Sequence, residues 1–551
     1  MASSKQADQA GWGVIVLLAA AQFVMVIDAT VMNVSISTIV EDLDTTGVGI
    51  QTAITAFTLI IASLMLTGGK LGERFGPRRA FALGLLIYGA GSMTTALAPN
   101  LGVLLLGWSL LEALGAVLVI PAIVALVSAT YSGAQRALSF GIIGGVAGAA
   151  AAAGPIIGGL ASTYASWRWV FAAETILCVI ILLASRAIPS PAGKAGKPFD
   201  FVGVALSVTG LGAFVIGILQ SSQWGWITPT ARVPQINGEP FAPLGYSPVI
   251  WLVVGGIVFL ALFARWEQRV ERKGGEPLLD LALLTVRPLR AGLSTLMVQQ
   301  FIIAGTFFVL PLYLQTVLGL DPLATGLRML PLSLMRFVFA LGGSALSSRF
   351  SPKAIVRVGL IAALVAEVVL QASIDPQLRS ALFAVALGIL GAGVGLLASQ
   401  LGNVNLSSVP SERGSEVGGL QGTAQNLGSS VGTALVGALL ISALGAGFVA
   451  TVDANPALPD EVTTAVEQAR EGGLDFVSSS VVEQVASEKL PANEAEALVA
   501  DYESAQIEAL RRAVGIIALV ALLGLWFLRD LPAQIITGGG DLDGARGNST
   551  A

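Results

Sequence analysis

Histidine is absent from this chain of 551 residues, and Cys178 is its only cysteine. The lack of histidine excludes a histidine proton relay, a histidine metal site and a Ser/His/Asp triad. A single cysteine excludes an internal disulfide and any cysteine-rich metal site. Proton chemistry near neutral pH must therefore use carboxylates, because burial away from water favours their protonated form.

Charge is also scarce. Only 12% of the residues are charged, whereas an ordinary soluble protein has about 25%. The net charge is −5, and no basic patch stands outside the segments that join the apolar runs. The composition therefore gives no indication of a nucleic-acid partner.

Hydrophobic residues are abundant, at 54% of the chain. They recur in runs of about 20 residues, the length that crosses a bilayer. No soluble domain of useful size fits between these runs. The first run is preceded by only one lysine and is followed by no small-residue cleavage site, so we predict a retained helix rather than a signal peptide.

We count about fourteen membrane spans, which predicts an all-α polytopic membrane protein. The predicted spans are 13–40, 50–69, 80–98, 102–128, 137–164, 170–188, 201–220, 249–266, 291–314, 323–347, 354–372, 378–405, 418–444 and 513–528. With the N-terminus inside, 21 of the 30 Lys and Arg residues fall on the cytoplasmic side and 7 outside. This bias predicts cytoplasmic N- and C-termini.

One long outside loop, 447–508, is acidic, with 13 Asp and Glu against Arg470 and Lys489. Val462 and Val466 follow helical spacing, and Gly472-Gly473 is a helix stop signal. The pattern predicts a short amphipathic helix on the outer face. The alternative is an acidic vestibule that attracts cations.

The chain contains an internal repeat. GKLGERFGPRR begins at Gly69 and SALSSRFSPKA begins at Ser344, an offset of 275 residues, or about half the chain. Both copies join two spans on the predicted cytoplasmic side. Two halves related by duplication are a common plan among transporters, with the site between them near the bilayer midplane.

Among the charged residues inside predicted spans four stand out, namely Asp28, Glu112, Glu174 and Arg336. A charge at that depth costs at least about 2.5–3.5 kcal/mol, so it normally faces a cavity or a partner and marks a substrate or proton pathway. For Asp28 and Glu112 the alternative is a structural hydrogen bond. Arg336 is expected to pair with a carboxylate, either as a state-dependent lock or as a static salt bridge.

Glu174 lies nearer the outer end of its span, so it could instead reach the interface or pair with Arg168. Glu367 occupies a similar position in a later span and has the same alternatives. The tryptophans near span ends are expected to form interfacial belts. They are Trp108, Trp167, Trp169, Trp224, Trp226 and Trp251.

Four motifs resemble those of the major facilitator superfamily, and in particular of its fourteen-helix drug:proton antiporters. They are GKLGERFGPRR at 69–79, IDATVMNV at 27–34, GPIIGG at 154–159 and WRWVF at 167–171. The resemblance implies a conformational latch in the first motif, formed by Gly69, Glu73, Arg74, Gly76, Arg78 and Arg79. It implies an antiporter motif formed by Gly154, Pro155, Gly158 and Gly159, in which small residues let helices approach closely.

Two positions depart from the family pattern. The fourth helix usually carries R-x-x-Q-G, but here the arginine is absent and Glu112 replaces the glutamine. After WRWVF the family often has L-I-N, where this chain has Ala172-Ala173-Glu174. The sequence thus loses one buried cation and gains two buried carboxylates relative to the family.

The resemblance implies two six-helix bundles with two extra helices between them. The predicted organisation is an N-terminus at 1–12, a bundle at 13–188, a linker region with two spans at 189–290, a second bundle at 291–528 and a tail at 529–551. We expect a monomer in the plasma or inner membrane, surrounded by lipid. The expected partners are protons and small amphiphilic or cationic molecules, with no nucleic acid.

The predicted function is proton-driven export of amphiphilic, often cationic, toxic compounds, with the proton gradient as energy source and neither cofactor nor metal. No Walker-type phosphate loop occurs, so an ATP-driven pump is not expected. The alternatives are a dedicated exporter of an endogenous metabolite, antibiotic or lipid, an importing symporter, or a lipid-modifying membrane enzyme. The enzyme is disfavoured because no nucleophile–base constellation is present.

Overall fold

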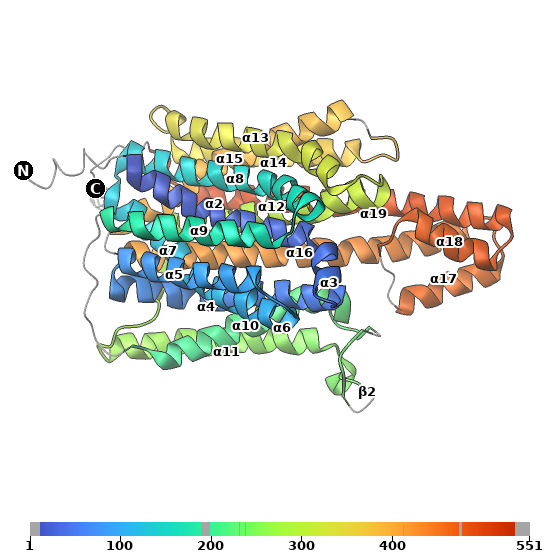
Figure 1. Ribbon diagram of the computed structural model, residues 1–551, viewed down its shortest axis with the longest axis horizontal. Helices are drawn as coiled ribbons and strands as arrows, with labels where there is room; N and C mark the ends of the chain where they lie inside the picture. The colour runs from blue at the N-terminus through green and yellow to red at the C-terminus, as the bar shows by residue number, and fades with distance from the viewer. Residues whose placement is uncertain are drawn as a thin grey trace, which may run out of the picture.

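The computed structural model describes residues 12–188, 199–230, 232–236, 239–378, 380–410, 413–472 and 476–534. Its architecture is a bundle of long helices that run roughly parallel to one axis (Figure 1). Two short strands, β1 (Gln235–Ile236) and β2 (Glu239–Pro240), pair antiparallel in the connection between two of these helices. The prediction of an all-α protein is confirmed.

The first half of the chain supplies six long helical segments. Their elements are α2 (Trp12–Val34), α3 (Ile36–Asp42), α4 (Gly47–Phe75), α5 (Pro77–Ala96), α6 (Leu101–Leu104), η1 (Leu105–Glu112), α7 (Ala113–Thr130), α8 (Gly133–Tyr164), α9 (Arg168–Ala184) and η2 (Ser185–Ala187). Here α6, η1 and α7 form one continuous span, and α3 is a short helix that follows a break at Ser35.

The remaining helices follow in the order that the sequence predicts. They are α10 (Phe201–Trp224), η3 (Pro243–Gly245), α11 (Pro248–Arg272), η4 (Leu281–Thr285), α12 (Arg287–Pro311), η5 (Leu312–Val317), α13 (Pro322–Leu346), α14 (Pro352–Ser373), α15 (Ser380–Ser407), α16 (Gly414–Asp453), α17 (Asp460–Gly472), α18 (Ser479–Lys489), α19 (Ala492–Gly524) and η7 (Leu525–Asp530).

Thirteen helices in the described residues are long and apolar enough to cross a membrane. The predicted span at 80–98 corresponds to α5, which is 20 residues long but falls short in hydropathy because Arg78 and Arg79 lie in its first turn. It still packs along α7, η1 and α9. The predicted number of long helices is therefore correct, although one of them is less apolar than the others.

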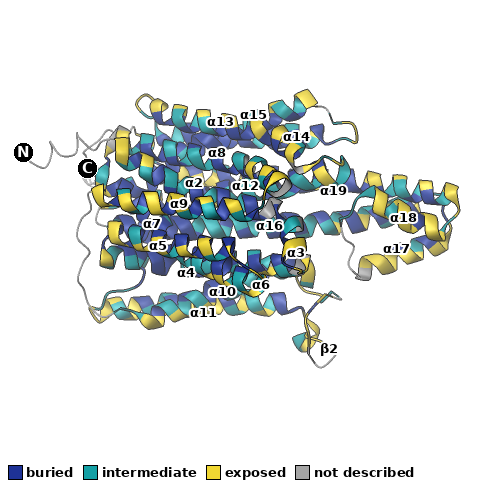
Figure 2. Cartoon of the chain, viewed as in Figure 1, coloured by how far each residue is buried: buried dark blue, intermediate teal, exposed yellow. Residues whose placement is uncertain are grey.

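Burial differs sharply between the central and outer helices (Figure 2). The span from Leu101 to Thr130 is mostly buried, whereas α11 exposes large apolar residues such as Ile257 and Val258 along its length. Exposed apolar side chains on a helix of spanning length face lipid. The extra helices α10 and α11 pair with each other, and α10 packs on α4 and α16.

The described chain begins and ends at one end of the bundle, which we call the terminal end (Figure 1). The turn between α4 and α5 also lies there. It needs a glycine because Gly76 has φ +88°, and Pro77 starts α5 with its φ already set for a helix. The opposite end, which we call the distal end, carries the connection that holds β1 and β2.

The predicted loop 447–508 is largely helical and projects from the distal end (Figure 1). Helix α17 confirms the expected amphipathic segment and ends at Gly472; Gly473 lies outside the described residues. The sequence did not predict α18, or that α16 and α19 continue as helices into the projection. Tyr502 is buried there, packs its ring on Phe448 and bonds the backbone of Val477.

Candidate functional site

Three of the four predicted intramembrane charges meet inside the first half of the protein. Asp28 of α2, Glu112 at the end of η1 and Glu174 of α9 each contribute a carboxylate oxygen, and these oxygens lie within 4.8 Å of one another. All three side chains are buried, with exposed fractions of 0%, 0% and 2%. We call these residues the carboxylate cluster.

The helix around Glu112 is a π-helix over Leu105–Glu112. The wider turn changes which side chains face inward, and such segments are frequent at functional sites. It buries Trp108, whose Nε1 donates to Asp28 Oδ1 at 2.9 Å. The Trp108 ring stacks on Phe57 of α4 with centroids 4.6 Å apart. The stacking and the hydrogen bond to Asp28 together fix the position of the Trp108 side chain.

Helix α5 supplies hydroxyl groups to the other two carboxylates. Ser92 Oγ donates to Glu174 Oε2 at 3.2 Å. Thr95 Oγ1 lies 2.9 Å from Glu112 Oε1 and 3.0 Å from the carbonyl oxygen of Gly91. A hydroxyl has one hydrogen, so Thr95 can donate to only one of these acceptors. A protonated Glu112 that donates to Thr95 lets Thr95 donate to Gly91, which satisfies both contacts.

The second oxygen of each cluster carboxylate has no hydrogen-bond partner in the described part of the structure. Two unit charges 4.8 Å apart repel by about 3.5 kcal/mol at an effective dielectric of 20. Burial adds a further cost to every ionised carboxylate. Full ionisation of the cluster is therefore strongly disfavoured in this conformation.

The same oxygens could contact a divalent cation, because carboxylate oxygens are the ligands that Mg²⁺, Ca²⁺ and Mn²⁺ prefer. Three oxygens are fewer than the six or more that Ca²⁺ takes. The hydroxyl and indole donors already bound to these carboxylates suit proton exchange better than metal binding.

The structure corrects three expectations about these residues. Asp28 and Glu112 are buried within the first half in this conformation, rather than lining an open cavity between the halves. Glu174 does not reach the interface. Trp108 and Trp167 are each 1% exposed and donate to carboxylates, whereas Trp169 is 69% exposed, as an interfacial residue would be.

The WRWVF motif anchors the start of α9 at the distal end. Arg168 pairs with Asp42 at 2.7 Å, which excludes its pairing with Glu174 in this conformation. Its guanidinium also donates to the carbonyl oxygens of Ala96 and Ala98, and Trp167 Nε1 donates to Asp42. The motif thus ties α9 to α3 and to the end of α5.

Arg336 is separate from the carboxylate cluster. It lies on α13, where its side chain packs against Gly148 of α8, and it is 8% exposed. Its Nε has no hydrogen-bond partner among the described residues, and no ion pair with a carboxylate is found for it there. The expected pairing with a carboxylate is therefore wrong for this conformation.

Glycines lie on two faces of α8, and each face packs against a different helix. Gly141, Gly145 and Gly148 face α13. Gly154 lies so close to α2 that a Cβ there would overlap Thr30 Oγ1, and Gly158 packs on Val31. A Cβ on Gly159 would meet nothing within 4 Å. The side chain of Pro155 is outside the described part of the structure.

The predicted latch is built around the α4–α5 turn. Lys70 lies 3.0 Å from Glu73 and 3.3 Å from Glu276, which follows α11. Gly69 lies against Ser415 and Gly419 of α16, with no room for a side chain. These contacts join α4 both to the linker region and to the second half.

The basic residues of the latch have separate contacts. Arg74 lies over the Phe199 ring, 5.8 Å from its centroid. Arg78 donates to the carbonyl oxygens of Arg186 and Ile188, at the end of α9. Arg79 is exposed. The latch residues thus hold α4 and α5 to neighbouring elements of the terminal end.

The halves are joined by hydrogen bonds at the terminal end. Arg136 of α8 donates to Asn403 and Ser407 of α15, each at 3.0 Å. Nearby, Arg413 pairs with Asp280, whose backbone N–H donates to Glu416. These contacts join the first half and the linker region to the second half at the terminal end.

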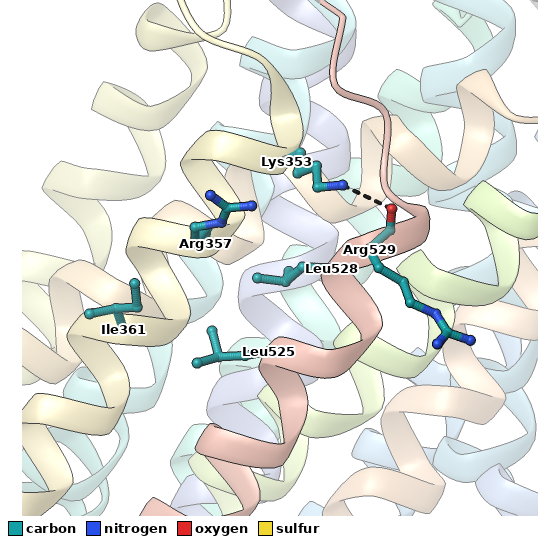
Figure 3. Close-up of a pocket in the computed structure, with 6 residues that line it drawn as sticks. All are labelled: Lys353, Arg357, Ile361, Leu525, Leu528 and Arg529. Atoms are coloured by element: carbon teal, nitrogen blue, oxygen red, sulfur yellow. Dashed lines mark hydrogen bonds between the residues drawn. The ribbon is translucent and has the colours of Figure 1, made fainter.

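A surface groove of about 320 Å³ lies at the terminal end of the second half, and none of the residues of the carboxylate cluster lines it (Figure 3). Lys353 donates there to the carbonyl oxygen of Arg529, at the end of the sixth helix of that half. Lys353 is the repeat partner of Arg78, which makes the corresponding bond at the end of α9. The matching contacts support the internal repeat.

Ser92, Thr95 and Arg136 were not predicted as site residues, and Trp108 was expected only in an interfacial belt. Two signals were available: Trp108 precedes Glu112 by four residues, and Ser92 and Thr95 are polar residues three apart in an apolar span. Spacing alone does not reveal which carboxylate each of them meets.

Comparisons with known proteins identify the family and the fold of this chain. The sequence matches the Major Facilitator Superfamily over residues 18–433. It is 30% identical to a puromycin resistance protein of Streptomyces alboniger, over 81% of this chain and 84% of that protein. It is 27% identical to a multidrug efflux pump of Mycolicibacterium smegmatis, over 94% of this chain and 96% of the pump.

Solved structures show the same fold. A proton:xylose symporter superposes with a TM-score of 0.57 at 11% identity, covering 98% of this chain and 99% of the symporter. At this identity the likeness concerns the fold alone. Together with the family match and the drug-resistance relatives, it confirms the predicted resemblance and identifies a multi-pass transporter rather than an enzyme. The chain belongs to the major facilitator superfamily.

Proposed function

We propose that the protein exports amphiphilic, often cationic, small molecules in exchange for protons. The observation that carries the proposal is the buried carboxylate cluster, in which the three oxygens lie within 4.8 Å of one another. Such a cluster takes up and releases protons as the charge near it changes. The relatives are antibiotic-resistance and multidrug efflux proteins, which supports export rather than import.

In the proposed cycle the halves rock about the interface that α8 forms with α13 and α15. Protons enter from the side of higher proton concentration and neutralise the cluster. A cationic substrate on the other side then favours their release, since a carboxylate is stabilised by a nearby cation. Each proton leaves to water as the substrate binds, so charge is exchanged without nucleotide hydrolysis.

The terminal end is proposed to face the cytoplasm. The α4–α5 turn, with Arg74, Arg78 and Arg79, lies at this end, and so does the connection between α13 and α14, which carries Arg349, as the positive-inside rule requires. Because the halves are closed there, we assign this conformation to the outward-facing side of the cycle. The residues of the predicted latch are proposed to stabilise it.

The proposal is tested with the purified protein in liposomes. A pH gradient is imposed, and the movement of a panel of cationic, neutral and anionic compounds is followed. We expect cations to move against their gradient and a protonophore to stop them. Transport that survives collapse of the pH gradient but requires added ATP would overturn the proposal.

A narrower function is a second candidate. Three relatives are a puromycin resistance protein, a tetracenomycin C resistance and export protein, and a probable actinorhodin transporter, all of Streptomyces species. These names favour a dedicated exporter of one antibiotic. The same panel separates the candidates, since a dedicated exporter would move one chemical class and reject the others.

A further inference from the structure

The second half contains a buried carboxylate that the proposed function does not use. Glu367 lies on α14 and is 0% exposed. Its Oε1 is 2.8 Å from Thr306 Oγ1 of α12, and its Oε2 has no hydrogen-bond partner in the described residues. An ionised carboxylate with one neutral donor at this depth would be costly, since burial removes the solvation of its charge.

The hydrogen-bond pattern at Thr306 indicates where the proton lies. Thr306 Oγ1 is also 2.7 Å from the carbonyl oxygen of Ile302, one turn earlier in α12. The hydroxyl has one hydrogen and two acceptors, Ile302 O and Glu367 Oε1. A protonated Glu367 that donates to Thr306, which in turn donates to Ile302, satisfies both contacts, whereas an ionised Glu367 would compete with Ile302 O for the single hydrogen. Thr95, Gly91 and Glu112 repeat this arrangement in the first half.

The position of Glu367 follows the internal repeat. It lies 275 residues after Ser92, which is the offset between the two copies of the repeat, and Ser92 bonds Glu174 of the carboxylate cluster. Glu367 therefore occupies, in the second half, the region where the first half holds its cluster. From α19, the Arg511 guanidinium donates to the carbonyl oxygen of Ile374, seven residues beyond Glu367 on the same segment.

We propose that Glu367, paired with Thr306, is a second proton-binding site, so that each half of the transporter carries its own. The inference rests on the proposed proton exchange and adds to it a proton held by the second half. In this conformation the carboxyl group is neutral. When the halves rock and water reaches the carboxyl group, the Oε1–H bond breaks, the proton passes to water and the carboxylate remains until a proton from the opposite side replaces it.

The test counts protons. Purified protein in weakly buffered detergent solution is mixed with a transported cation, and the protons released per bound cation are measured with a pH-sensitive dye. Glu367→Gln keeps the shape of the side chain but cannot release a proton. We expect it to release fewer protons than the wild type. In liposomes it should sustain a substrate gradient lower by about tenfold for each unit of imposed pH difference, because each proton contributes a factor of ten per pH unit.

Glu112→Gln is the matched control, since it removes a carboxyl group from the same kind of Thr–Glu pair in the first half. If Glu112→Gln lowers the proton count and Glu367→Gln does not, the proposed exchange stands and the inference about Glu367 is wrong. If the wild type releases no protons, the proposed function itself fails.

A second measurement covers the case in which Glu367→Gln does not fold. Thr306→Val leaves the carboxyl group in place but removes its hydroxyl partner. Infrared difference spectra between acid and alkaline conditions should show the C=O stretch of a protonated carboxyl group that shifts in Thr306→Val. A spectrum unchanged by this substitution would overturn the assignment.

Discussion

Asp28 accepts its hydrogen bond from the Trp108 indole, a neutral donor, so its charge is not balanced by a cation. Asn keeps the oxygen that accepts from Trp108 but cannot exchange a proton. We expect Asp28→Asn to fold normally and to lose transport against a gradient at least tenfold. The measurement is pH-driven uptake of a cation into inside-out vesicles. Normal uphill transport by this variant would show that Asp28 is not needed for coupling.

Glu112 should decide charge selectivity. Glu112→Gln keeps the contact to Thr95 and removes a group that becomes negative when it releases its proton as a cation binds. A loss of about 1.4 kcal/mol corresponds to a tenfold weaker affinity. We expect the loss to be largest for divalent cations, smaller for monovalent cations and smallest for neutral compounds, measured as binding affinities of matched ligands. Equal fractional losses in all three classes would mean that Glu112 does not select charge.

At this scale the sequence identifies charged residues but not their neighbours. Asp28, Glu112 and Glu174 stand out because each interrupts an apolar run. Their meeting depends on how α2, η1 and α9 are rotated, which tertiary packing decides. Arg336 stands out for the same reason, yet it lies against α8 rather than beside a carboxylate. A charge that interrupts an apolar run therefore shows that its burial costs free energy, but it does not show which residue the charge contacts.

The packing of α8 on α2 requires a close approach of the two helices at Gly154. Gly154→Ala would place a methyl group on Thr30 and should cost about 1–3 kcal/mol, because a packed interface gives way only by shifting. Gly159→Ala belongs to the same motif but meets nothing within 4 Å, so it should be neutral or slightly stabilising. Thermal unfolding of both variants in detergent is the measurement. A similar melting temperature for the two would contradict the packing argument.

Helix positions were predictable from apolar runs, whereas changes within a helix were not. Each predicted span corresponds to a helix, including α5 despite its polar start. The π-helix over Leu105–Glu112 was missed, because its residues are as apolar as those of an ordinary span. The same holds for the break at Ser35, where neither glycine nor proline marks the change.

For the whole molecule, closure of the terminal end is the property to test. Arg136→Gln removes charged hydrogen bonds to Asn403 and Ser407 and should destabilise the closed state by about 1.5–3 kcal/mol. Spin labels at the exposed, repeat-related Phe75 and Phe350, in a Cys178→Ser background, report the distance between the halves. We expect a longer distance to gain population at least tenfold. An unchanged distribution would show that Arg136 does not hold the halves together.

The order of the long helices along the chain was predictable, because apolar runs of spanning length mark them. The family match confirms the fold that the motifs imply. Apart from α17, the structure of 447–508 was not predictable, because this stretch is too polar to be recognised as a continuation of the spans. Its stability comes from contacts between elements distant in sequence, such as Tyr502 with Val477 and Asn455 with Asp501.

The length of α16 has a practical consequence. Its 40 residues extend about 60 Å, roughly twice the thickness of the hydrocarbon core. Together with α17, α18 and α19 it forms an arm outside the bilayer that belongs to the second half alone (Figure 1). A detergent micelle hides most features of a transporter of this size from electron microscopy, but this arm would stay visible and would set the orientation of each particle. Because the arm is continuous with helices of the second half, its tip would also move further than any residue within the membrane when the halves rock.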